Sequence, residues 1–110
     1  MSVKKTISVA EFQEVVEREH YNSYQYSTEN QPWDDGGKIV MCRQHLTFQT
    51  IHISPKMPGC PAVTFSGAAG TIAFLNVCKV ERKGNVFTLY CKPWEGDMDC
   101  IGYSVIARNN

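Results

Sequence analysis

The chain has 110 residues, of which 43% are hydrophobic and 20% are charged, and its formal net charge at pH 7 is zero. This size and composition predict one globular domain over residues 1–110 and exclude an intrinsically disordered chain. No apolar run reaches the roughly 20 residues of a membrane-spanning helix, and no secretory signal is recognisable, so the sequence predicts a cytoplasmic protein without a membrane partner.

Acidic and basic side chains are segregated along the chain. Residues 11–35 carry seven acids and one base, whereas residues 38–92 carry seven bases and one acid. Such asymmetry is typical of a protein with a charged partner. It also fits a fold in which the acidic segment packs over the basic one, and both interpretations stay open here.

Residues 8–19 carry the signals of an amphipathic helix. Ser8 and Glu11 form a capping box, in which each side chain can bond a backbone N–H at the start of the helix. The apolar side chains share one face at helical spacing, at Val9, Phe12, Val15 and Val16. A helix this short needs a packing partner, so we expect its apolar face to lie on a sheet.

The next segment, residues 20–37 (HYNSYQYSTENQPWDDGG), is polar and rich in tyrosine. It contains no aliphatic residue and is predicted to be a long loop, a kind of segment that is usually functional or disordered. Tyrosine and tryptophan provide rigid contact area in protein-binding loops. The predicted partner-binding residues are therefore Tyr21, Tyr24, Tyr26, Trp33, Asp34 and Asp35. Trp33 has a second interpretation, as a core residue that closes one end of the fold.

Residues 38–107 are predicted to be β-structure because branched and aromatic residues recur between turn signals. The expected strands are Lys38–Gln44, Leu46–Ser54, Ala62–Ser66, Thr71–Val80, Val86–Lys92 and Cys100–Ala107. A helix over residues 71–82 is the alternative for one of them. The predicted fold class is α+β: one N-terminal helix packed on a small, curved, mainly antiparallel sheet, or on a partly open β-barrel, of about five or six strands.

Five cysteines occur at irregular spacings, and the sequence predicts reduced thiols because an odd count does not suit a disulfide framework. The hairpin after residue 80 has two possible registers, and neither places Cys78 opposite Cys91. No pair of Cys or His has the close spacing of a zinc site, which leaves Cys42, His45 and Cys60 as weak metal candidates. No cofactor motif is present, because the glycine-rich SGAAG segment lacks the lysine and spacing of a phosphate loop.

These observations favour a small non-enzymatic protein-interaction module, an accessory or inhibitor protein that covers a surface of its partner. The acidic residues of the loop favour a partner protein with a basic surface. A homodimer formed by strand-edge pairing, with Cys100–Ala107 as the pairing strand, is a variant of this hypothesis. The alternatives are a small-molecule- or metal-binding barrel with a Cys/His-lined site, and a single-stranded nucleic-acid binder, which the diluted bases disfavour.

Overall fold

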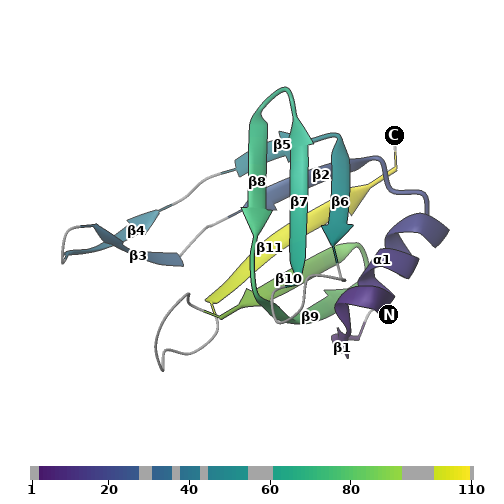
Figure 1. Cartoon of the computed structure of the whole chain (residues 1–110), viewed down its shortest axis with the longest axis horizontal. Coiled ribbons are helices and arrows are strands. Elements are labelled where there is room, and N and C mark those ends of the chain that lie inside the picture. The colour runs from purple at the N-terminus through teal and green to yellow at the C-terminus, as the bar shows by residue number, and fades with distance from the viewer. Residues whose placement is uncertain are drawn as a thin grey trace.

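The computed structural model describes residues 3–27, 31–35, 38–42, 45–54, 61–92 and 101–109, with backbone alone for residues 31–35, 38–42 and 101. Within these ranges the chain forms one helix and antiparallel strands (Figure 1). The predicted α+β class with a mainly antiparallel sheet is confirmed. Cys60 and Cys100 lie outside the described residues.

The larger sheet runs in the order β1-β9-β10-β11-β2-β5, and every neighbouring pair is antiparallel. Its strands are β1 (Lys5–Ile7), β9 (Val77–Lys83), β10 (Val86–Cys91), β11 (Ile101–Arg108), β2 (Ser23–Ser27) and β5 (His45–Phe48). A three-stranded sheet crosses it in the order β6 (Thr50–Ser54), β7 (Ala62–Gly67) and β8 (Gly70–Phe74). The strands β3 (Gln31–Asp35) and β4 (Lys38–Cys42) pair only with each other among the described strands, and they stand out from the body of the molecule (Figure 1).

Two segments that the sequence predicts as single strands are each divided between the two main sheets. Leu46–Ser54 breaks at Gln49, and Thr71–Val80 breaks at residues 75–76, where Asn76 has a φ of 54°. At each break the chain leaves one sheet and enters the other. The prediction of continuous strands is wrong here because periodicity along the chain does not show which strand each half pairs with.

The N-terminal helix α1 (Val9–Arg18) forms as the sequence predicts. The Ser8 hydroxyl caps it by accepting the Glu11 N–H at 3.0 Å. Phe12 is buried by the large sheet, with its ring centroid 4.8 Å from that of Phe87 on β10. At the other end of α1, Glu19 accepts a hydrogen bond from the Arg82 guanidinium of β9 at 2.6 Å. This pair joins the acidic segment of the sequence to the basic one.

The core lies between the two main sheets and under α1. It is dominated by aromatic and β-branched side chains, among them Tyr24, Tyr26, Phe48, Val63, Phe65, Phe74, Val80, Phe87, Leu89 and Val105. Within the described residues, α1 is too short and too polar to cross a membrane.

The prediction of a loop over residues 20–37 is wrong for two segments. Residues Ser23–Ser27 form β2, which lies inside the large sheet between β11 and β5, and Gln31–Asp35 form β3. In β2 the rings of Tyr24 and Tyr26 are 2% and 3% exposed. Because every second residue of a strand points to the same face, these two tyrosines point into the core together.

The pairing of the last strand also differs from expectation. β11 bonds to β10 on one side and to β2 on the other. Along Ser104–Ile106 it is therefore paired on both sides, whereas Ile101–Tyr103 pair with β10 alone among the described strands. The pairing of this strand with its copy in a homodimer stays a prediction, restricted to the part of the strand before Ser104.

Candidate functional site

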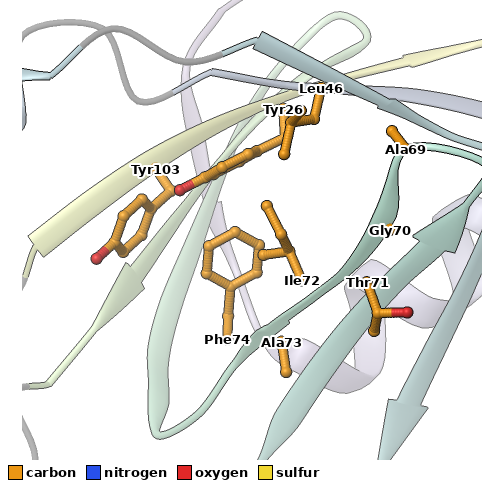
Figure 2. Close-up of a pocket in the computed structure, with 9 residues that line it drawn as sticks. All are labelled: Tyr26, Leu46, Ala69, Gly70, Thr71, Ile72, Ala73, Phe74 and Tyr103. Carbon is orange, nitrogen blue, oxygen red and sulfur yellow. The ribbon is translucent and has the colours of Figure 1, made fainter.

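A cleft of about 550 Å³ lies between β8 and the large sheet (Figure 2). One wall comes from the large sheet and the other follows β8 along its whole length. The lining residues are Tyr26, Leu46, Ala69, Gly70, Thr71, Ile72, Ala73, Phe74 and Tyr103. None of them carries a formal charge, and most of the lining is aromatic or aliphatic. The cleft therefore suits an uncharged, apolar guest.

Three aromatic rings from three different strands form the base of the cleft. The Phe74 centroid lies 5.1 Å from that of Tyr26 and 5.0 Å from that of Tyr103, and the two tyrosine rings are 6.0 Å apart. Ile72 projects from β8 toward Tyr26, as Figure 2 shows. Burial raises the pKa of Tyr103 above its ordinary value of 10.0, so this hydroxyl is neutral over a still wider pH range than that of an exposed tyrosine.

The backbone of β8 has an open edge, which we define as the side that none of the described strands pairs with. Ser66 of β7 lies opposite Thr71, and its carbonyl accepts the Gln49 N–H at 3.0 Å and the Thr50 hydroxyl at 3.1 Å. The N–H and C=O of a strand residue point to the same side, so Ser66 bonds toward β6. Thr71 therefore points its own N–H and C=O away from β7, and so does Ala73 two residues later.

An exposed apolar residue follows β8 directly. Leu75 is 43% exposed, and among the described residues it is one of two large hydrophobic side chains with such exposure, the other being Val3 near the N-terminus. An exposed leucine alone is common at protein surfaces. Here it adjoins an open strand edge and an apolar cleft, which together form one continuous candidate contact region.

The predicted partner-binding residues are dispersed by the fold. Tyr24 is a core residue and does not line the cleft, whereas Tyr26 contributes its buried ring to the base of the cleft. Tyr21 is partly buried against the core, with its ring 6.1 Å from Phe87. Only the backbone is described for Trp33, Asp34 and Asp35, all three in β3. The expectation that Tyr24 and Tyr26 are exposed anchors is wrong, because both lie on the face of β2 that is turned toward the core.

The weak metal candidates are not brought together by the described residues. His45 is exposed at the start of β5, Cys42 lies in β4 with only its backbone described, and Cys60 falls outside the described ranges. Nowhere in the described part of the chain do three or more Cys, His, Asp or Glu side chains gather at metal-binding distance.

The hairpin that holds two of the cysteines has a register that the sequence did not suggest. Val86 lies opposite Lys83, and an irregularity further along places Cys91 opposite Val77. Cys78 is thereby displaced from the ladder, and its thiol donates to the Tyr90 carbonyl at 3.1 Å.

The outer face of the large sheet carries a network of charged groups. Glu81 pairs with Lys4 at 3.0 Å and with Lys79 at 3.7 Å, and the Lys79 ammonium lies 4.5 Å from the centre of the Tyr90 ring. A hydrogen bond with Tyr90, and then one with Lys4, lowers the pKa of Glu81 below its ordinary value. A smaller cavity of about 300 Å³ adjoins this network. The carboxylate partly neutralises the neighbouring lysines, so this face is less suited to nucleic acid than a purely basic groove.

Apart from Tyr26, none of the residues that line the cleft was predicted from the sequence; those missed are Leu46, Ala69, Tyr103 and the residues of β8. In β8 the sequence shows an alternating pattern, because the large apolar residues Ile72 and Phe74 alternate with the smaller Thr71 and Ala73. That pattern predicts a half-buried strand but not an open edge, because an edge is defined by the strands that pair beside it.

Comparisons of the chain with protein-family models, with curated proteins and with solved structures found no match.

Proposed function

We propose that this protein is a small interaction module that captures an extended, uncharged segment of a partner protein along the open edge of β8. The segment adds a strand beside β8, and its apolar side chains enter the cleft. The two main sheets act here as a partly open barrel, with the cleft as the opening. The observation that carries the proposal is the combination of outward-facing backbone groups on Thr71 and Ala73 with an uncharged apolar cleft beside them.

The chemistry of such binding follows from the geometry. Main-chain hydrogen bonds to the N–H and C=O of Thr71 and Ala73 would provide affinity for any extended backbone. Alternate side chains of the added strand point to the same face, so every second one would meet the rings of Tyr26, Phe74 and Tyr103. A charged side chain at these positions would be buried without a partner and is therefore rejected.

The module acts by covering the segment it binds. A partner segment held as an added strand is no longer accessible to other strands or enzymes, which is how an accessory or inhibitor protein of this size can act. The proposal keeps a protein as partner. The contact surface moves from the loop to β8, and of the two β2 tyrosines only Tyr26 remains part of it, at the base of the cleft.

Proline substitution at the edge tests the proposal. In Ala73→Pro the outward N–H is replaced by a ring that blocks strand addition, whereas the bonds between β8 and β7 are made by the neighbouring residues. Ala73→Ser keeps the N–H at the same exposed position and is the matched control. Thr71→Pro and Thr71→Ser repeat the pair, in case one proline variant fails to fold.

The binding assay uses random seven-residue peptides displayed on phage and selected on the wild-type protein. We expect the selected peptides to alternate apolar and variable residues, and to bind Ala73→Ser as they bind the wild type. Their dissociation constants should rise about tenfold or more on Ala73→Pro, a loss of about 1.4 kcal/mol or more. If no peptide is enriched on monomeric protein, in which the β8 edge is free, or if a folded Ala73→Pro protein binds the peptides as tightly as the wild type does, the proposal is wrong.

A second candidate function is the binding of a small apolar molecule in the same cleft. The volume of about 550 Å³ favours it, because it falls in the usual range of about 300–1,000 Å³ for ligand pockets. Native mass spectrometry of the purified chain, compared with its denatured mass, tests this function. A reproducible excess mass that Ile72→Lys removes would support it, and a native mass equal to the sequence mass or to a whole multiple of it would count against it.

A further inference from the structure

The β3–β4 hairpin, which we call the arm (Gln31–Asp35 and Lys38–Cys42), is a separate two-stranded ribbon. Its register runs from Gln31 opposite Cys42 to Asp35 opposite Lys38, and it extends away from the two main sheets (Figure 1). An isolated two-stranded hairpin is marginally stable at best in water. A third strand beside the arm would therefore stabilise it.

The outer edge of β4 is the better place for such a strand. β3 contains Pro32, which has no N–H to donate, and it lies on the side of the arm that contacts β11. β4 has the sequence Lys-Ile-Val-Met-Cys, a run with high strand propensity. Its one charged residue, Lys38, stands at the first position of the strand.

β4 has the properties that the proposed function requires of a guest at β8. Both strands are five residues long. The segment Ile39–Cys42 is uncharged and apolar, as is the lining of the cleft. One copy of the chain thus offers both a strand that needs a partner and an open edge with a matching cleft.

We propose that the guest at the β8 edge is β4 of a second copy of this chain, and that two copies exchange their arms in a reciprocal dimer. Each arm would lie on the partner's β8, so that both open edges are covered at once. Reciprocal contacts of this kind close a two-fold dimer, whereas a one-way contact would continue into a larger ring or a filament. This inference rests on the proposed function, because it takes the β8 edge as the binding site.

The first test is the oligomeric state of the full-length chain, measured by native mass spectrometry and by light scattering over a range of protein concentrations. We expect a dimer for the wild type and for Ala73→Ser, and a monomer for Ala73→Pro. On the arm, Val40→Glu places a charge in the apolar run and should give a monomer. Val40→Thr, which remains β-branched and uncharged, should leave the dimer intact.

A mixing experiment separates arm exchange from other ways of dimerising. Ala73→Pro retains a functional arm, and Val40→Glu retains a functional edge. When the two monomeric variants are mixed, one of the two contacts can form, so we expect a mixed dimer that neither variant forms alone. Labelling one variant with ¹⁵N distinguishes the mixed species by mass.

The outcomes distinguish this inference from the function on which it rests. A wild-type chain that is monomeric at every concentration overturns the exchange, and peptides that bind its β8 edge still support the proposed function. A dimer that survives both Ala73→Pro and Val40→Glu overturns the exchange as well, because its interface lies elsewhere. Species that grow beyond a dimer with concentration overturn the reciprocal arrangement.

Discussion

Replacement of Tyr24 by alanine is the most direct test of the fold, because the sequence and the structure give this residue opposite roles. As an exposed contact residue it could be removed with little loss of stability. In the structure it is 2% exposed, its ring centroid lies 5.3 Å from that of Phe65 across the sheets, and its hydroxyl donates to the Tyr21 carbonyl at 3.2 Å. Tyr24→Ala therefore opens a cavity at the contact between the two sheets.

The expected cost follows from these contacts. Truncation of a buried aromatic side chain to alanine lowers the free energy of unfolding by about 3–5 kcal/mol. The lost contact with Phe65 accounts for about 0.5–1.5 kcal/mol of this, and the lost hydrogen bond for about 1 kcal/mol. For a domain of this length the melting temperature should fall by about 12–20 °C. Such a loss is a large part of the about 5–15 kcal/mol that stabilises a typical domain.

Urea unfolding followed by circular dichroism measures this loss as a lower midpoint at an unchanged slope. Gln25→Ala is the matched control, since it lies next to Tyr24 on the opposite face of β2 and should cost less than about 1 kcal/mol. Tyr24→Phe, which removes only the hydroxyl, keeps the comparison possible if the alanine variant does not fold. Equal costs for Tyr24→Ala and Gln25→Ala would show that the ring is not in the core, and the assignment of β2 would fail.

Three further outcomes are expected. Burial raises the pKa of Tyr24 from 10.0 to about 12, so the unfolded chain loses this proton at lower pH than the folded one. Stability should be intact below pH 10 and fall as the pH rises from 10 to 12, a fall that is smaller in Tyr24→Phe. Gly67→Ala should lower the free energy of unfolding by about 1–3 kcal/mol, because the new Cβ would lie 3.0 and 3.1 Å from backbone atoms that cannot easily move. Gly102→Ala should lower it less, because the Cβ there meets only side-chain atoms, the nearest at 3.1 Å. Arg82→Gln should cost about 1–3 kcal/mol through the lost bond to Glu19.

Each of these expectations has a result that would contradict it. An alkaline loss of stability that is the same in wild type and Tyr24→Phe would assign the titration to another group. Equal losses of unfolding free energy in the two glycine variants would mean that Gly67 is not closely packed against the backbone of Phe48 and Gln49. If Arg82→Gln is no less stable than wild type in low salt, the link between α1 and β9 contributes nothing to stability.

The sequence alone determined the local structure, because local structure depends on neighbouring residues. The helix starts where Ser8 and Glu11 form a cap, and Phe12, Val15 and Val16 are buried as their spacing predicts. The α+β class followed from one helical segment ahead of many strand-like ones. The sequence also contains a pattern that is typical of a half-buried strand at β2, because Tyr24 and Tyr26 alternate with polar residues. Tyrosine suits both a core and a contact surface, and so the signal did not decide between them.

The tertiary structure decided the pairing of the strands, and with it the candidate site. Whether Ser23–Ser27 lies inside a sheet, whether Leu46–Ser54 turns a corner at Gln49, and whether β8 keeps an open edge all depend on residues distant in sequence. The cleft exists because Phe74 from β8 meets Tyr26 and Tyr103 from two strands of the other sheet. A periodic pattern specifies which side chains share a face, but only non-local hydrogen bonds determine what lies beside that strand.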